Sequence, residues 1–220
     1  MGRSAGSAES SENLHEGQPI ETAGAPPEAA QAAVVLLHGR GSTAQSILTL
    51  IDEFLHHGVM YLAPQAANSS WYPRSAFAPI EENEPWLSAA IGRVSAAIET
   101  AAAADVPPER TLLLGFSQGG CLAGEFVARN PRRYGGLVVL SGSLPGPERT
   151  RDYSATIDGT PVFFGCSADD PYVPAERVHD SVRVFERLDG DVRYRLYDGL
   201  GHAINDDEIQ TVNSFIERIV

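Results

Sequence analysis

The sequence predicts an α/β protein in which a mostly parallel sheet carries helices on both faces. Short aliphatic runs alternate with segments of helical periodicity, a pattern typical of parallel sheets built from strand–helix–strand units. The run Val34–Leu37 is unbroken by polar residues, as expected for a strand buried on both faces. A Gly-x-Ser-x-Gly motif at 115–119 separates a second aliphatic run from a stretch compatible with a helix. Together these features favour one open sheet wound by helices.

The 220 residues fit a single domain that follows a short tail. Residues 1–17 are rich in serine, glycine and alanine and lack hydrophobic periodicity, so we expect this tail to be disordered. Residues 18–220 are expected to form the domain. The sequence shows no internal repeat that would divide it.

The periodic segments define the expected elements in order. The expected strands are 19–22 at an edge, followed by 34–37, 59–63, 110–114, 137–140, 161–165 and 192–197. The expected helices are 43–57, 86–104, a segment that follows the serine motif, 177–188 and 206–220. The helix over 43–57 is predicted from apolar residues at helical spacing between Ile47 and Leu55, with Ser42 as its N-cap.

One connection, residues 64–85, is long and has no clear periodicity. Long irregular loops in compact domains are commonly functional, and this one is too apolar for a free linker. We therefore expect it to line a substrate pocket. The candidate substrate-binding residues are Trp71, Tyr72, Phe77, Trp86 and Leu144. The alternatives are that these side chains plug the core or that an apolar patch here joins two copies of the chain.

Composition excludes several classes of function. Acidic residues outnumber basic ones by 29 to 16, and the net charge of −13 disfavours nucleic acid as a partner. No apolar stretch approaches the roughly 18 residues of a membrane span, and the N-terminus lacks the apolar core of a secretory signal. The two cysteines, Cys121 and Cys166, are expected to be buried free thiols. We expect a cytoplasmic protein that needs no cofactor or metal, because no nucleotide or metal-ligand motif is present.

The motif at 115–119 predicts an exposed nucleophile at Ser117. A tight turn between a strand and a helix strains the backbone of its central residue, so the residues two positions before and after it must lack a Cβ atom. Gly115 and Gly119 meet this requirement. A serine between glycines also occurs in ordinary turns. The aliphatic run before it and the helix after it favour the nucleophile here.

A serine nucleophile needs a base that a carboxylate orients. Of the six histidines, His202 alone follows a late strand, across a glycine-containing loop that lets the imidazole reach the sheet edge. The loop after the preceding strand contains Asp169 and Asp170, and only one of them can face the histidine. We favour Asp170 because Pro171 stiffens the backbone beside it. Asp169 remains the alternative, with capping of the loop as its structural role.

Two backbone amides are candidate donors to an oxyanion. The N–H of Gln118 begins the helix after Ser117, and the loop 38–42 carries glycines on both sides of Arg40, which let the Arg40 N–H turn inward. We expect the side chain of Arg40 to matter less than its amide. The structural alternative is a plain strand-to-helix turn with a solvated arginine.

Four segments stand out in the same order as in one enzyme family: 35–41, 115–120, 170–174 and 201–202. Together they resemble the phospholipase/carboxylesterase family of α/β-hydrolases, which includes the acyl-protein thioesterases. The resemblance extends from about Val34 to Phe215. It implies an α/β-hydrolase fold with little or no cap, a triad of Ser117, Asp170 and His202, and an oxyanion hole made by the amides of Arg40 and Gln118.

The resemblance also implies a reaction. It points to a serine carboxylesterase that hydrolyses small to medium carboxylic esters through an acyl-enzyme on Ser117. Arg40 stands where the eukaryotic thioesterases carry leucine, which argues against a long-chain lipidated-protein substrate. An acyl thioesterase or a lysophospholipase would use the same residues, and a catalytically silent binding protein is the alternative of another class. The expected partner is a small-molecule ester or thioester, and formation of a homodimer stays open.

Overall fold

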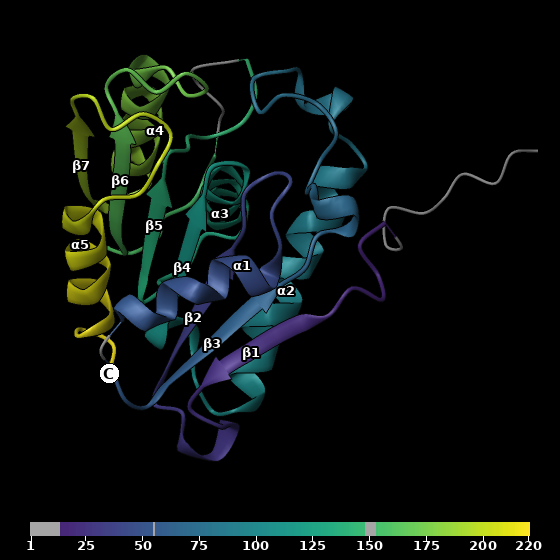
Figure 1. The fold of residues 1–220 in the computed structure, drawn as a ribbon, viewed down its shortest axis with the longest axis vertical. Coiled ribbons are helices and arrows are strands. Elements are labelled where there is room, and N and C mark those ends of the chain that lie inside the picture. Colours follow the sequence, from purple (N-terminus) through teal and green to yellow (C-terminus); the bar gives the residue numbers. More distant parts are fainter. Residues whose placement is uncertain (1–13, 55, 148–152) are drawn as a thin grey trace, which may run out of the picture.

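A computed structural model describes residues 14–54, 56–147 and 153–220, which form a 7-stranded sheet (Figure 1). The strands are β1 (Ile20–Gly24), β2 (Ala32–Leu37), β3 (Val59–Pro64), β4 (Thr111–Phe116), β5 (Gly136–Leu140), β6 (Pro161–Ser167) and β7 (Asp191–Tyr197). Their order is β1-β3-β2-β4-β5-β6-β7. The edge strand β1 runs antiparallel to β3 and the other neighbours are parallel. The predicted mostly parallel sheet is therefore confirmed.

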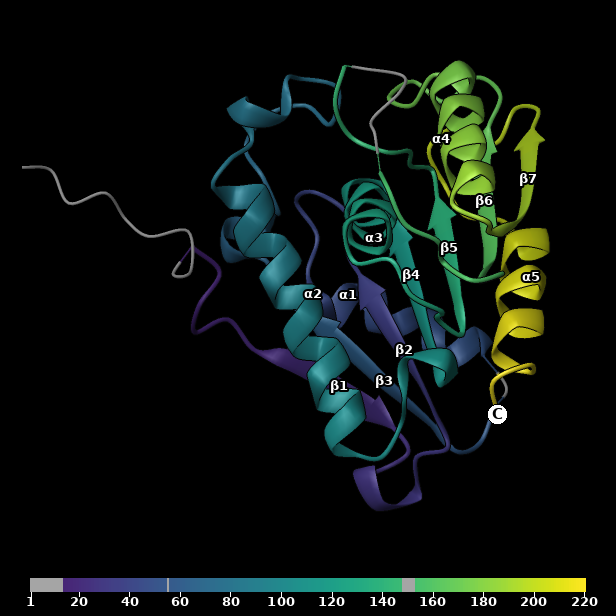
Figure 2. The ribbon, with the colours of Figure 1, turned by 180° about the vertical axis from the view of Figure 1, so that it is seen from behind.

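Helices cover both faces of this sheet. They are α1 (Ala44–Leu48), α2 (Trp86–Ala103), α3 (Gln118–Arg129), α4 (Ala175–Arg187) and α5 (Asp206–Ile216). Helices α1 and α5 lie over the face seen in Figure 1, and α2, α3 and α4 lie over the face seen in Figure 2. Between β3 and α2 the chain forms only short 3-10 turns, so no helical cap is inserted there. This is the predicted α/β-hydrolase fold.

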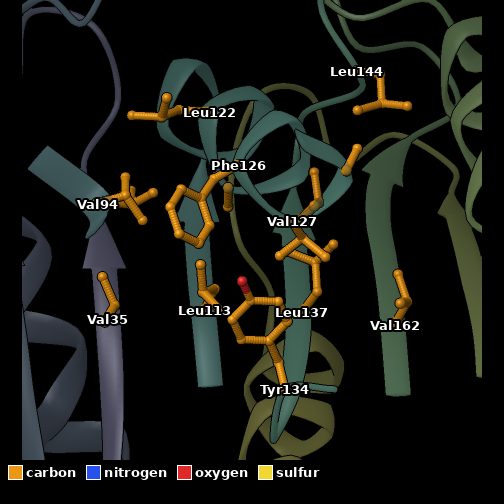
Figure 3. Close-up of a cluster of buried hydrophobic side chains, with 14 of the residues drawn as sticks. Val35, Val94, Leu113, Leu122, Phe126, Val127, Tyr134, Leu137, Leu144 and Val162 are labelled. Atoms are coloured by element: carbon orange, nitrogen blue, oxygen red, sulfur yellow. The ribbon is translucent and has the colours of Figure 1, made fainter. Parts of the chain in front are cut away.

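The core fixes α3 over the centre of the sheet. Alternate residues of the strands enter two buried clusters, one on each face. In the larger cluster, Leu122, Phe126 and Val127 of α3 lie against Leu113 and Leu137 of the sheet (Figure 3). Because this packing holds α3 on β4 and β5, the start of α3 is held at the carboxyl end of the central strands.

The helix expected over residues 43–57 is shorter than predicted. Helix α1 ends at Leu48 and continues as a 3-10 turn over Thr49–Glu53. Its N-cap is Thr43 rather than Ser42, because the Thr43 side chain accepts a hydrogen bond from the N–H of Ser46 at 3.1 Å. Phe54 then leaves in an extended conformation and buries its ring against Tyr61. Tertiary packing of this ring accompanies the end of the helical turns at Glu53.

The two ends of the chain also differ from expectation. Helix α5 ends at Ile216 rather than Val220, and the Arg110 guanidinium donates to the carbonyls of Ile219 and Val220 at 3.1 and 3.0 Å. Residues 1–13 of the expected tail lie outside the described residues. His15 is not disordered but buried, because its ring hydrogen-bonds to the backbone of loop 65–85.

In the described parts of the chain, no helix has the length and apolar character needed to cross a membrane.

Candidate active site

Ser117 occupies a strained turn between β4 and α3. Its backbone has φ 54° and ψ −121°, a conformation that L-residues rarely adopt. A Cβ atom at Gly115 would collide with the backbone of Gly119, and one at Gly119 would collide with the carbonyl of Leu37. The steric requirement read from the motif is therefore present in the structure. It holds the serine above the carboxyl end of the sheet.

Three side chains from distant parts of the sequence form one hydrogen-bonded chain. Ser117 Oγ lies 2.9 Å from Nε2 of His202, and His202 Nδ1 lies 2.8 Å from Oδ2 of Asp170. An ionised carboxylate only accepts hydrogen bonds, so Nδ1 carries the imidazole proton and Nε2 has a free lone pair. This arrangement can take a proton from the Ser117 hydroxyl when that oxygen attacks an electrophile.

Asp170 is held by the backbone of its own loop. Its Oδ1 accepts hydrogen bonds from the N–H groups of Tyr172 and Val173 at 2.8 and 3.0 Å. The thiol of Cys166 lies 3.8 Å from Oδ2. Burial, with a further contribution from Asp170, raises the pKa of the Cys166 thiol to about 12, so this thiol is a neutral donor to the carboxylate. Asp170 therefore has one defined oxygen that faces His202.

Asp169 has a different partner. Its carboxylate accepts a hydrogen bond from the Ser167 hydroxyl, and this contact lowers the pKa of Asp169. Ser167 Oγ in turn accepts from the N–H of Gly201 at 3.1 Å. The structure thus brings Asp170 to the imidazole, whereas Asp169 braces the loop that precedes His202. That bracing corresponds to the structural role considered for Asp169 from the sequence.

A cavity of about 500 Å³ opens beside Ser117 and His202. Of the residues proposed to bind substrate, Tyr72 and Phe77 line it. Further lining residues that the sequence did not single out for this purpose are Ser75, Ala76, Cys121, Tyr172 and Val173. Cys121 lies one helical turn after Ser117, so its spacing on α3 was the available signal. Burial raises the pKa of the Cys121 thiol, which makes it a neutral part of the wall.

The other three proposed binding residues are not among those that line this cavity. Trp71 is fully buried, and its indole Nε1 donates to the carbonyl of His38 at 2.8 Å. Trp86 packs its ring beside that of His15. Leu144 lies within the buried cluster on α3 (Figure 3). These positions are those of core or bracing residues.

Because Phe77 lines the cavity and Trp71 lies in the core, their substitution should have different effects. Phe77→Ala should enlarge the cavity and raise kcat/KM for longer acyl esters, relative to shorter ones, by about tenfold or more, with little change in melting temperature. Trp71→Ala should instead lower the free energy of unfolding by about 3–5 kcal/mol, because it empties a fully buried site. An acyl-length panel and thermal melts measure the two effects. Equal loss of stability in both variants would show that Phe77 is also a core residue.

A second cavity of about 300 Å³ also reaches Ser117 and His202. The α1 region supplies Ile47, Thr49 and Leu50 to its wall. Arg40, Ser117 and His202 line both cavities, so the two cavities meet at the serine.

The candidate oxyanion residues flank the serine. Arg40 and Gln118 both line the larger cavity with Ser117. Gln118 is the first residue of α3, and the N–H groups of a first helical turn have no acceptor within the helix. The Arg40 guanidinium is not simply solvated, because it donates to backbone carbonyls of loop 65–85. No motif or spacing in the sequence indicated these contacts of the Arg40 side chain.

A mostly parallel sheet with a serine on a strand-to-helix elbow, facing an imidazole and a carboxylate, defines an α/β-hydrolase. The family model described as phospholipase/carboxylesterase matches residues 19–220. The chain belongs to this family, and it is an enzyme of the carboxylesterase class.

Two curated plant relatives and one solved bacterial structure illustrate the similarity. The probable carboxylesterase SOBER1-like of Arabidopsis thaliana is 27% identical, over 86% of this chain and 79% of the relative. A probable inactive carboxylesterase of Oryza sativa subsp. japonica is 26% identical, over 85% of this chain and 84% of the relative. A phospholipase/carboxylesterase from Dyadobacter fermentans has 40% identity and a TM-score of 0.86, over 91% of this chain and 96% of that one.

Proposed function

We propose that the protein is a serine carboxylesterase that hydrolyses small to medium carboxylic esters through an acyl-enzyme on Ser117. The observation that carries this proposal is the continuous hydrogen-bonded chain from Ser117 Oγ through His202 to Asp170, with steps of 2.9 and 2.8 Å. Membership of a carboxylesterase family supports the reaction class. The strained elbow supports the choice of nucleophile.

Acylation follows from the order of the three side chains. His202 Nε2 takes the hydroxyl proton as Ser117 Oγ forms a bond to the ester carbonyl carbon, and the carbonyl oxygen becomes an oxyanion. The N–H groups of Arg40 and Gln118 donate to that oxyanion. Asp170 stabilises the imidazolium through Nδ1. The bond between the carbonyl carbon and the alkoxy oxygen then breaks, and Nε2 gives its proton to the departing alcohol.

Deacylation repeats these steps with water. His202 Nε2 accepts a proton from a water molecule that attacks the acyl carbon of Ser117. The second tetrahedral intermediate is held by the same two amides. Its collapse breaks the bond to Oγ, returns the proton to Ser117 and releases the carboxylic acid.

The substrate class is inferred from the larger cavity. About 500 Å³ falls in the range of pockets for small organic ligands. Phe77, Tyr72 and Val173 give part of its wall an apolar surface, which suits an alkyl or aryl acyl group. A small to medium acyl group therefore fits the proposal better than a long lipid chain.

Two measurements test this function. A fluorophosphonate should form a single adduct, located at Ser117 by peptide mass spectrometry, and nitrophenyl esters should give a burst of one nitrophenol per enzyme followed by slower turnover. Absence of both the adduct and turnover would contradict the proposal and indicate a silent binding protein, as one rice relative is named inactive. Matched oxygen esters and thioesters in the same assay distinguish a carboxylesterase from an acyl thioesterase.

A further inference from the structure

One backbone carbonyl receives hydrogen bonds from both proposed oxyanion residues. The carbonyl oxygen of Tyr72 accepts from Arg40 Nη2 at 2.8 Å and from Gln118 Nε2 at 2.8 Å. Arg40 lies in the loop after β2, and Gln118 begins α3 after β4. The side chains that follow the two amides thus meet at a single atom, which belongs to neither loop.

Further contacts extend this junction along residues 71–74. Arg40 also donates to the carbonyls of Pro73 and Arg74, at 3.0 and 2.5 Å. The other end of the Gln118 carboxamide, Oε1, accepts from the N–H of Trp71 at 3.0 Å. A planar guanidinium presents several donors in a fixed fork, so three carbonyls restrain its orientation strongly. Each loop is therefore tied to the same short segment more than once.

The segment that receives these bonds is itself anchored. Trp71 and Tyr72 are 0% and 1% exposed. The N–H of Arg74 donates to Asn83 Oδ1 at 2.8 Å, and Asn83 Nδ2 donates to the carbonyl of Ser75 at 3.0 Å. The ring of His15 hydrogen-bonds to the carbonyl of Trp71 at 3.0 Å. Residues 71–74 thus form a fixed support against which the two flanking loops are held.

We propose that the side chains of Arg40 and Gln118 are positioning residues that act through the Tyr72 carbonyl. By binding one shared atom, they fix the separation and direction of the two backbone N–H groups that face the oxyanion. This inference rests on the proposed function, because the role of those amides is assigned there. Loop 65–85 then has two roles, because Tyr72 lines the cavity and its carbonyl accepts the hydrogen bonds of Arg40 and Gln118.

A purely structural role would have a different signature. Arg40 is an exposed residue, and hydrogen bonds at a surface can stabilise a fold without any effect on the reaction. Loss of a purely structural tie would lower the melting temperature and leave kcat unchanged. Loss of amide positioning weakens binding of the tetrahedral state, because a donor displaced by a fraction of an ångström no longer meets the oxyanion.

The test uses Arg40→Met and Gln118→Met, which keep the backbone amides and similar side-chain length but remove the polar ties. Arg40→Lys retains a cation that can reach fewer carbonyls. Arg110→Met is the matched control, because Arg110 also donates to two backbone carbonyls but at the C-terminal end of the chain. We measure kcat and KM for a nitrophenyl ester, the Ki of a trifluoromethyl ketone that forms a tetrahedral adduct, and the melting temperature.

Each methionine variant at the site should lower kcat about 10- to 100-fold and raise the Ki of the trifluoromethyl ketone by a similar factor, with KM within about threefold. Arg40→Lys should fall between wild type and Arg40→Met. Arg110→Met should change only the melting temperature. The double variant should lose less than the product of the two single losses, because both side chains act on one carbonyl.

The inference is overturned if Arg40→Met and Gln118→Met keep the wild-type Ki while their melting temperatures fall, or if their losses multiply. If Arg40→Met does not fold, Arg40→Lys and Gln118→Met carry the same comparison. Failure of the proposed function is distinct, because the wild-type protein would then form neither the Ser117 adduct nor the ketone complex. That result would remove the inference as well.

Discussion

Ser117→Ala should lower kcat at least about a thousandfold and leave the fold unchanged. The hydroxyl oxygen is the proposed nucleophile, and alanine has no atom that can form the acyl-enzyme. Alanine keeps the Cβ atom, so the strained backbone at φ 54° faces the same steric demands as before. The substitution removes the hydrogen bond between Ser117 Oγ and His202 Nε2. Loss of one hydrogen bond should shift the melting temperature by only a few degrees. Steady-state kinetics and thermal melts give both numbers.

Ser141→Ala provides the matched control for this substitution. Ser141 is also a serine with positive φ, at 47°, and it follows β5 at the same end of the sheet. Its hydroxyl makes one long contact, 3.5 Å to the carbonyl of Ala203, and it has no role in the proposed mechanism. We expect activity within about tenfold of wild type. Near-normal turnover by a Ser117→Ala preparation free of wild-type enzyme would exclude the acyl-enzyme mechanism.

The strands could be predicted because burial on both faces leaves a direct record in the sequence. Every strand from β2 to β6 consists largely of buried residues, so each appears as a mainly apolar run. The end of α1 left no such record. Periodicity alone continues the helix to residue 57, whereas the helical turns end at Glu53, where Phe54 becomes extended and packs against Tyr61. Contacts between distant residues decide such boundaries.

The proposed triad could be inferred because chemistry restricts both residue type and chain position. Serine at an elbow, an acid after a late strand and a histidine after the last strand satisfy a fixed order. The aromatic loop had no comparable constraint. Trp71 lies in the core, where its indole N–H donates a hydrogen bond to the His38 carbonyl, whereas Phe77 lines the cavity, and no local pattern distinguishes the two. The burial of His15 against the same loop also depends on a partner far along the chain.

Asp170→Asn should lower kcat by about three to four orders of magnitude without unfolding the protein. The reason lies in the two backbone N–H groups of Tyr172 and Val173, which require an oxygen at the Oδ1 position. An asparagine must therefore keep its carbonyl there and turn its NH₂ group toward His202. The imidazole can accept that hydrogen bond only at Nδ1, so its proton moves to Nε2. In that tautomer His202 cannot take the proton of Ser117.

Asp169→Asn tests whether this loss is specific. Asp169 is exposed, and its hydrogen bond from the Ser167 hydroxyl can be accepted equally by the asparagine carbonyl. The brace on the loop before His202 then survives, and we expect kcat within about tenfold of wild type. The two variants carry the same chemical change at adjacent positions. Loss of one negative charge therefore cannot by itself explain a difference in kcat between them. A large loss in Asp169→Asn with a small one in Asp170→Asn would reassign the carboxylate. Equal large losses would mean that the loop needs both negative charges, and the tautomer argument would then fail.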